Sequence, residues 1–262
     1  MDTTHLFSLQ GKTALVTGGS RGIGKMIAAG FLAQGAKVYI SSRKADACNQ
    51  TAQELSQGGG TCIPLPMDVS TLEGARALAS AYAAHEASLD ILVNNAGAAW
   101  LAGFDDFPEK GWDKVMDLNV KSPFFLTQAL AAPLRAAARP DRPAKVINIA
   151  SIDGIYLTPI ETYSYAASKS ALIQLTRLMA SRLARDHIVV TAIAPGPFKS
   201  DMNVRARDQE AEVAAQVPVQ RIGTDLDMAG AAIFLASRAG DYVVGSVITV
   251  DGGIAFASSP AR

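Results

Sequence analysis

The residues of this chain best suited to proton transfer are Tyr165 and Lys169, four positions apart in an apolar, helix-forming segment. In an α-helix, positions i and i+4 lie one turn apart on the same face, so phenol and ammonium can share a site. A free tyrosine has a pKa of about 10, and a neighbouring cation lowers it by stabilising the phenolate. The spacing therefore predicts an activated tyrosine acid, although a packed ring beside a solvated charge would show the same pattern. Tyr163 lacks such a partner, because Ala167 occupies the corresponding position.

Short apolar runs alternate with longer helical patterns along the whole chain. Near-continuous apolar runs are typical of strands buried on both faces of a parallel sheet. Their alternation with helices indicates a single α/β domain with a doubly wound sheet over residues 1–262, and residues 195–223 form an irregular substrate loop or lid. The predicted strands are Thr13–Thr17, Lys37–Ser41, Thr61–Leu65, Asp90–Val93, Lys145–Ile149, Ile188–Ile193 and Ser246–Val250, and the predicted helices are Gly24–Gln34, Ala45–Gln57, Thr71–Glu86, Trp112–Ala138 and Ser164–Arg185.

Small and polar residues follow the predicted strands at the points where they end. Ligands of open α/β sheets bind outside the carboxyl ends of the strands, so these residues indicate the edge where a site should lie. Ordinary turn formation would also favour such residues there, so the ligand stays open at this point. The residues are Gly18-Gly19, Asp68, Asn94–Gly97, Ser151, Pro195-Gly196 and Asp251–Gly253.

A glycine-rich loop, Thr17–Gly24, follows the first strand and opens the first helix. Glycines let a ligand approach the backbone closely, and the amide groups of a helix N-terminus favour an anion. A tight turn would need similar glycines, but the order of strand, glycines and helix favours a nucleotide phosphate. The predicted contacts are Gly18, Ser20, Arg21, Gly22, Ile23 and Gly24.

The end of the second strand indicates which nucleotide is bound. An NAD-selective site carries an acidic residue there for the ribose hydroxyls, whereas this chain has Ser41, Ser42 and Arg43. Arg43 and Arg21 can each give bidentate, charge-assisted hydrogen bonds to a 2′-phosphate. Either arginine alone would be a solvated charge, but together they predict NADP(H).

Composition excludes several other classes of protein. Lys plus Arg and Asp plus Glu number 24 each, so no nucleic-acid-binding surface is expected. No apolar run reaches the ~18 residues of a membrane helix, and Met1–Gln10 lacks the pattern of a secretory signal. Cys48 and Cys62 match no metal spacing. We expect a cytoplasmic protein without a metal site.

These residues together resemble the short-chain dehydrogenase/reductase family, from about Leu9 to Gly253. The resemblance implies a single-domain Rossmann-type fold around a parallel sheet of about seven strands in the order 3-2-1-4-5-6-7. It also implies hydride transfer between a nicotinamide and a carbonyl or alcohol carbon. The motifs that carry it are Thr17–Gly24, Asp68, Asn94–Gly97, Asn119, Ser151, Tyr165 with Lys169, Pro195-Gly196 and Asp251–Gly253.

The resemblance implies four catalytic residues. Tyr165 would protonate the carbonyl oxygen, and Ser151 would hydrogen-bond the same oxygen. Lys169 would bind the nicotinamide ribose and lower the tyrosine pKa, and Asn119 would hold a water between lysine and solvent. Without a catalytic role, Ser151 would simply end a strand, and Asn119 would form a hydrogen bond with a helix backbone.

Further cofactor contacts and an assembly also follow from the resemblance. Tyr165 and Lys169 would contact the cofactor as well as the substrate. Family members are usually tetramers or dimers, so a homotetramer or homodimer is expected through the long helices. The other implied cofactor contacts, besides the glycine-rich loop and Arg43, are Asp68 and Val69 near the adenine, Asn95, Ala96, Gly97, Pro195, Gly196 and Ser200.

The catalytic serine and tyrosine stand fourteen residues apart, one more than is usual in the family, so residues 152–164 must absorb the extra residue. Some acyl-thioester reductases of the family share this longer loop, including the rhamnolipid-associated type, which the chain also resembles around Gly111–Met116. Segments 98–106, 152–162 and 197–217 are expected to select the substrate, and their apolar residues suit an acyl chain. These are Trp100, Leu101, Phe104, Ile155, Tyr156, Leu157, Phe198, Met202 and Val204.

The residues bear on whether the thioester is carried by CoA or by a carrier protein. Asp186 stands where acyl-carrier-protein reductases often have an arginine, which favours a CoA thioester over a carrier protein. Four cations could meet the phosphates of CoA or of a carrier arm, namely Arg142, Lys199, Arg205 and Arg207.

Three functions are compatible with these residues. The leading one is NADPH-dependent reduction of a 3-oxoacyl thioester to the 3-hydroxyacyl product. The second is an alcohol dehydrogenase of the same family for a cyclic, steroid-like or polyol substrate. The third is a non-catalytic NADPH-binding regulatory protein, which is disfavoured because both Tyr165 and Lys169 are present.

Overall fold

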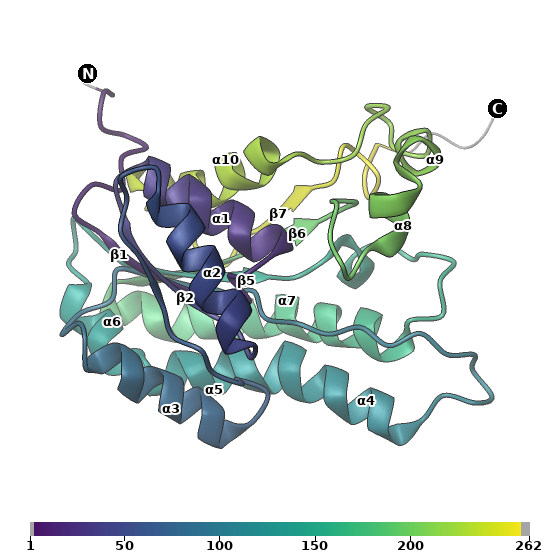
Figure 1. Ribbon diagram of the computed structural model, residues 1–262, viewed down its shortest axis with the longest axis horizontal. Coiled ribbons are helices and arrows are strands. Elements are labelled where there is room, and N and C mark those ends of the chain that lie inside the picture. Colours follow the sequence, from purple (N-terminus) through teal and green to yellow (C-terminus); the bar gives the residue numbers. More distant parts are fainter. Residues whose placement is uncertain (1–2, 258–262) are drawn as a thin grey trace.

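Seven strands pair in parallel into one sheet in the order β3-β2-β1-β4-β5-β6-β7, as predicted (Figure 1). The structure is a computed structural model and describes residues 3–257, so the ends of the predicted domain, residues 1–2 and 258–262, lie outside the described part. Each strand lies within two residues of its predicted bounds. The strands are β1 (Thr13–Thr17), β2 (Lys37–Ser41), β3 (Cys62–Pro64), β4 (Ile91–Asn94), β5 (Ala144–Ile149), β6 (Ile188–Pro195) and β7 (Val247–Val250).

Helices cover both faces of the sheet, which explains why most strands are apolar along their whole length (Figure 1). Most apolar strand side chains pack into two large clusters, one with each layer of helices, and a small third cluster includes Ala192 and Ala194 of β6. One layer contains α1 (Gly22–Ala33), α2 (Ala45–Ser56) and α10 (Asp225–Ala236), and the other contains α3 (Leu72–Ala83), α4 (Glu109–Met116), α5 (Ser122–Ala129), α6 (Ala131–Ala137) and α7 (Tyr163–Leu183).

The continuous helix predicted over Trp112–Ala138 is wrong, because the chain forms α4, α5 and α6 with interruptions between them. A π-helical turn, Asp117–Lys121, joins α4 to α5, and its closing bond runs from the Ser122 N–H to the Asp117 carbonyl. Pro123 follows at the start of α5. Since proline has no N–H, the Asn119 carbonyl lacks the i+4 partner of a regular helix. The distortion therefore falls at a residue predicted to take part in catalysis.

The predicted lid, residues 195–223, contains two short helices, α8 (Val204–Asp208) and α9 (Glu210–Ala214). Both lie at the end of the sheet toward which the strands run (Figure 1). An isolated parallel bridge between Phe198 and Gly223 joins the two ends of this segment. The Phe198 side chain is only 2% exposed. Phe198 therefore anchors the segment and does not line an open substrate surface, contrary to the sequence prediction.

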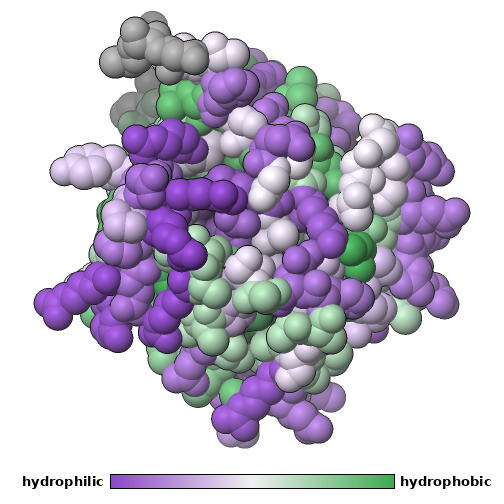
Figure 2. Space-filling model, turned by 90° about the vertical axis from the view of Figure 1, so that its left-hand side faces the viewer, coloured by the Kyte–Doolittle hydropathy of each residue, from purple (hydrophilic) through white to green (hydrophobic). Residues whose placement is uncertain are grey.

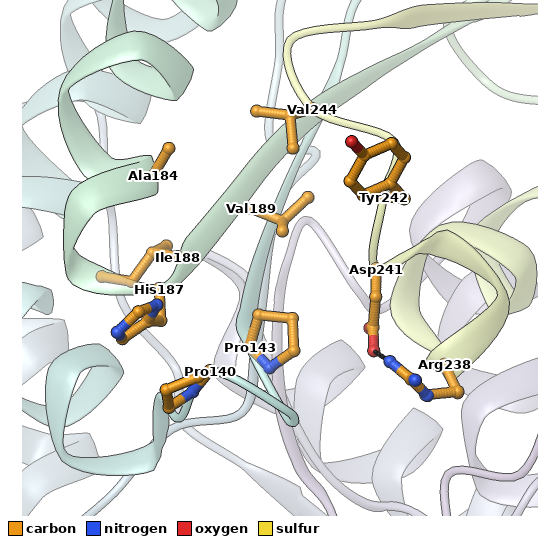
Figure 3. Close-up of a pocket in the computed structure, with 10 residues that line it drawn as sticks. All are labelled: Pro140, Pro143, Ala184, His187, Ile188, Val189, Arg238, Asp241, Tyr242 and Val244. Atoms are coloured by element: carbon orange, nitrogen blue, oxygen red, sulfur yellow. Dashed lines mark hydrogen bonds and ion pairs between the residues drawn. The ribbon is translucent and has the colours of Figure 1, made fainter.

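The opposite edge of the sheet, where the strands begin, is mainly hydrophilic with scattered apolar side chains (Figure 2). A cavity of about 370 Å³ opens at this edge, and the ion pair between Arg238 and Asp241 forms part of its wall (Figure 3). His187, which directly precedes β6, also lines it. Because α7 has 21 residues, its two ends lie about 30 Å apart, so this cavity is remote from Tyr165 at the start of the helix.

Residues 3–257 contain neither a membrane-spanning helix nor a cluster of metal-binding side chains. Within this range we find no helix with both the length and the apolar character needed to cross a membrane. The same residues bring together no group of three His, Cys, Asp or Glu side chains that could hold a metal ion. The predicted cytoplasmic location and oligomeric state stay predictions.

Candidate active site

The glycine-rich loop is held against the loop that follows β4. Gly18 has a φ of +64°, and a Cβ there would lie 2.7 Å from Asn95 Nδ2. The Asn95 amide donates to the carbonyls of Thr17 and Gly18 at 2.8 and 3.2 Å. A Cβ on Gly24 would collide with the Gly18 carbonyl. The glycines are therefore required by close backbone packing between the two loops.

The first turn of α1 can receive an anion. The helix begins at Gly22, and its N-cap residue, Arg21, makes no side-chain capping bond. The N–H groups of a first turn have no partner within the helix, so an uncapped N-terminus is suited to phosphate oxygens. No acidic residue lies in this turn. The loop thus has both the shape and the electrostatics expected of a phosphate site.

The other predicted cofactor residues lie at the same edge of the sheet. Arg43 is exposed just beyond β2. Asp68 accepts a hydrogen bond from the Ser70 N–H at 3.0 Å, so its carboxylate also stabilises the turn before α3. The Gly196 N–H donates to the Val250 carbonyl at 3.0 Å. The remaining residues in this region are Ser20, Ile23, Val69, Asn95, Ala96, Gly97, Pro195 and Ser200.

Tyr165 and Ser151 are brought together, as predicted. Ser151 directly follows β5, and Tyr165 lies in the first turn of α7. Ser151 lies close enough to lower the pKa of the Tyr165 phenol, and the Ser151 hydroxyl oxygen accepts the Asp153 N–H at 3.2 Å. The phenol and the serine hydroxyl can therefore both form hydrogen bonds with the same substrate oxygen.

Lys169 lies close to Tyr165, but the pKa of the tyrosine is raised above its ordinary value and not lowered. The Lys169 ammonium lies 5.4 Å from the centre of the tyrosine ring and donates to the Ile149 carbonyl at 2.8 Å. Burial raises the pKa of Tyr165 to about 12, opposed by the hydrogen bond from Ser151. Burial also lowers the pKa of Lys169 to about 8. Loss of hydration therefore outweighs the helical proximity of the two groups.

The side-chain amide of Asn119 is fully used within the protein. Its oxygen accepts the Ala98 N–H at 2.8 Å, and its nitrogen donates to the Ala98 carbonyl and to the Ser168 hydroxyl, both at 2.9 Å. Ser168 in turn donates to the Tyr165 carbonyl at 2.7 Å. Asn119 thus ties the loop after β4 to the catalytic helix.

Asp153 is a charged site residue that the sequence prediction missed. It lies in a 3-10 turn, Ile152–Gly154, that packs against α7, where the Ser170 hydroxyl donates to the Gly154 carbonyl at 3.0 Å. The Asp153 charge raises the pKa of both Tyr165 and Lys169, and burial raises its own pKa. The longer loop after Ser151 was the signal that could have drawn attention to it.

The contacts of Tyr163, the alternative candidate for the proton donor, indicate a structural role. Its hydroxyl donates to a Glu161 carboxylate oxygen at 2.7 Å, and this hydrogen bond is the main cause of its raised pKa. Its ring packs edge-on against Phe104 and Phe107, with ring centres 5.8 and 5.9 Å apart. Tyr163 therefore joins two of the predicted substrate segments.

Those substrate segments expose several large apolar side chains. Glu161 accepts the Ala102 N–H through its carbonyl at 3.4 Å, which holds segment 98–106 beside segment 152–162. The exposed apolar residues in the three segments are Leu101, Phe104, Ile155, Tyr156, Leu157, Ile160, Met202 and Val204.

The cations predicted to meet a CoA or carrier phosphate are mostly engaged elsewhere. Arg142 pairs with Asp90 at 3.0 Å at the edge where the strands begin, so its predicted role is wrong. Lys199 pairs with Glu210 at 2.7 Å, and Arg207 pairs with Asp208 at 2.7 Å. Arg205 lies exposed in α8.

The chain is similar to several known proteins. A family model described as enoyl-(acyl carrier protein) reductase matches residues 18–255. The chain is 50% identical over 250 residues to the rhamnolipids biosynthesis 3-oxoacyl-[acyl-carrier-protein] reductase of Pseudomonas aeruginosa, covering 94% of this chain and 97% of that protein. It is also 38% identical over 255 residues to the 2-dehydro-3-deoxy-D-gluconate 5-dehydrogenase of Dickeya dadantii, covering 95% and 97%.

Among solved structures, the RhlG/NADP active-site complex of Pseudomonas aeruginosa is similar with a TM-score of 0.92 and 47% identity, covering 95% of this chain and 98% of that one. The chain belongs to the short-chain dehydrogenase/reductase family. It is accordingly an oxidoreductase that acts on CH–OH or C=O groups. The names of its relatives divide between a thioester reductase and a sugar-acid dehydrogenase.

Proposed function

We propose that this protein is an NADPH-dependent reductase that converts a 3-oxoacyl thioester into the 3-hydroxyacyl product. The observation that carries the proposal is the placement of Tyr165 beside Ser151 at the carboxyl end of β5, with exposed apolar side chains in the neighbouring segments. The pair supplies an acid and a hydrogen-bond donor for one carbonyl oxygen. The apolar side chains supply contacts for an acyl chain.

NADP(H) is the cofactor that the residues fit. The uncapped start of α1 and the close-packed glycines favour a pyrophosphate. The end of β2 carries no acid, and Arg21 and Arg43 are exposed on the two neighbouring loops. Relatives include a structure solved with NADP. When bound, the nicotinamide supplies the hydride for reduction or accepts it for oxidation.

Each catalytic residue has a separate role in proton transfer. With a pKa of about 12, Tyr165 is protonated at neutral pH and can donate its proton to the substrate oxygen. Ser151 donates a hydrogen bond that lowers the tyrosine pKa and can orient the same oxygen. Lys169, with a pKa of about 8, carries its charge at neutral pH and can stabilise the phenolate left behind.

The tyrosine must be reprotonated after each turnover. Asn119 lies between the loop after β4 and the catalytic helix, and its carbonyl lacks the regular helical partner because Pro123 has no N–H. We assign to this carbonyl a water that passes protons from solvent toward Lys169. The side-chain amide instead holds the geometry through Ala98 and Ser168.

The charges near the catalytic pair favour a thioester over a sugar acid. Asp153 is the charged group that acts on both Tyr165 and Lys169 in the described residues, and its carboxylate would repel an anionic sugar acid. The apolar segments also offer little to a polyhydroxylated ligand. Because Lys199 and Arg207 are already paired, recognition of the thioester would depend more on the acyl chain than on carrier phosphates.

A second candidate is dehydrogenation of a cyclic alcohol, polyol or sugar acid by the same residues. The 38% identity to a 2-dehydro-3-deoxy-D-gluconate 5-dehydrogenase supports it. A non-catalytic role has less support, because the tyrosine, serine and lysine of the proton-transfer system lie together.

The test follows NADPH absorbance with purified protein and a panel of substrates. Acetoacetyl-CoA, longer 3-oxoacyl-CoA esters and the same acyl groups on a carrier protein are compared with cyclic ketones and, in the reverse direction with NADP, with sugar acids. Turnover of thioesters well above the other classes is expected. Inactivity on every thioester together with turnover of an alcohol or sugar acid would move the protein to the second candidate. Ser151→Ala is the control that separates enzymatic from background oxidation.

A further inference from the structure

The predicted lid is joined to the phosphate loop by an ion pair. A guanidinium nitrogen of Arg21, Nη1, lies 2.6 Å from Asp201 Oδ2, although the residues are 180 positions apart in the sequence. The two segments also touch beside this pair, since a Cβ on Gly22 would lie 3.3 Å from Ser200 Cβ. One arginine therefore belongs both to the predicted cofactor site and to the contact with the lid.

Asp201 is placed by the lid itself. Its other carboxylate oxygen lies 3.2 Å from Arg207 Nη1, and Arg207 also binds Asp208 through two nitrogens at 2.7 and 3.0 Å. Asn203 donates its N–H to the Ser200 hydroxyl at 3.0 Å and caps α8. Residues 200–208 thus form a compact unit that presents one carboxylate to the phosphate loop.

We propose that Asp201 is a positioning residue that competes with the 2′-phosphate of NADP(H) for Arg21 and thereby tunes the preference for NADPH over NADH. The inference depends on the proposed cofactor and on the predicted role of Arg21. A 2′-phosphate carries nearly two negative charges, and a carboxylate bound to the same guanidinium both neutralises the arginine and repels the phosphate. NADH has no 2′-phosphate and therefore does not compete with Asp201 for Arg21.

The same competition links the cofactor to the lid. Linkage is reciprocal, so a 2′-phosphate that weakens the Arg21–Asp201 pair must loosen the contact between lid and phosphate loop to the same extent. Arg207 retains Asp208 as a partner when Asp201 is displaced, so the compact unit of residues 200–208 can persist. The lid would then respond to NADPH and not to NADH.

The test measures dissociation constants of NADPH and NADH by calorimetry, without any substrate. Asp201→Asn should bind NADPH about 2- to 5-fold more tightly than the unsubstituted protein, which is the range of an exposed ion pair, and NADH with unchanged affinity. Asp208→Asn is the matched control, because it removes the same charge from the same unit but does not touch Arg21. It should leave both constants unchanged.

A double-mutant cycle with Arg21→Ala decides whether the effect passes through that arginine. In the Arg21→Ala background, Asp201→Asn should no longer change the affinity for NADPH. An Asp201→Asn variant with equal or weaker NADPH binding would overturn the proposal, as would an equal gain in Asp208→Asn or in the Arg21→Ala background. Because binding is measured alone, these outcomes are distinct from failure to reduce a thioester, which would concern only the proposed function.

Discussion

Charged side chains at the two edges of the sheet have different environments. At the edge where the strands begin, the Lys145 side chain is 1% exposed, and its ammonium lies 2.8 Å from Asp241, which also binds Arg238 at 2.6 Å. At the edge where the strands end, Lys169 is also buried, but the hydrogen bond of its ammonium goes to a main-chain carbonyl. The first lysine has a fixed counterion, whereas the second can redirect its charge toward a substrate or cofactor.

This difference suggests that one edge of the sheet contributes to stability and the opposite edge to function. A buried charge with a counterion is costly to disturb, because removal of either partner leaves the other uncompensated. A buried charge bound to a neutral carbonyl keeps a shifted pKa and can exchange its partner. We therefore expect substitutions at the first edge to change the free energy of unfolding, and those at the second edge to change catalysis or binding.

The largest effect is expected for Tyr165→Phe. The substitution removes the proton donor but leaves the ring, so kcat should fall by about 10³-fold with the best substrate while Tm stays unchanged. Steady-state kinetics and thermal unfolding would be measured on the same preparation. Retention of most of the activity would show that another group is the acid, and Tyr163→Phe, which should stay active, is the control.

The converse prediction concerns Asp241→Asn at the opposite edge. Loss of the counterion of Lys145 should reduce the free energy of unfolding by about 3 kcal/mol, with kcat of the folded protein unchanged. Burial lowers the pKa of Lys145 below its ordinary value of 10.5. The folded state therefore binds fewer protons than the unfolded state between these pKa values, and stability rises with pH there.

The destabilisation by Asp241→Asn should accordingly shrink as the pH rises toward 10.5, because a neutral lysine needs no counterion. Urea unfolding at several pH values would measure it. A loss of activity without a loss of stability would contradict the separation of the two edges.

A smaller effect is expected for Arg43→Ala at the end of β2. Loss of a charge-assisted hydrogen bond to the 2′-phosphate should raise the KM for NADPH by about 10-fold and leave that for NADH nearly unchanged. Lys44→Ala, which removes the neighbouring exposed charge, serves as the control. Equal effects of Arg43→Ala on both cofactors would reject the predicted 2′-phosphate contact.

The smallest predicted effect is a displacement of the pH profile by Asp153→Asn. The value of kcat/KM for NADPH should decline above a pH of about 8, as Lys169 loses its proton. Asp153 raises the pKa of Lys169 and of Tyr165, so its neutralisation should move this decline to lower pH. A shift toward higher pH, or none, would show that Asp153 does not act on the pair.

Much of the fold could be read from local patterns. Residues 13–17 and 37–41 have the predicted strand bounds, because an apolar centre between polar and turn-forming residues marks both ends of a buried strand. The helix predicted over Trp112–Ala138 failed where Pro123 and a π-helical turn interrupt the regular bonding. The periodic spacing of apolar side chains predicts a helix, but it does not show where the backbone hydrogen bonds of that helix are interrupted.

The sequence by itself determined the residue types of the site and their order: a glycine-rich loop before a helix, a serine after a strand, and Tyr165 one helical turn before Lys169. Local spacing is enough for these, because helix pitch and strand ends are short-range properties. Only the tertiary structure decided that burial raises the Tyr165 pKa, that Asp153 acts on the catalytic pair, and that Asp201 contacts Arg21. Burial, charge–charge interactions and contacts across 180 residues depend on how the whole chain packs, and no local pattern encodes them.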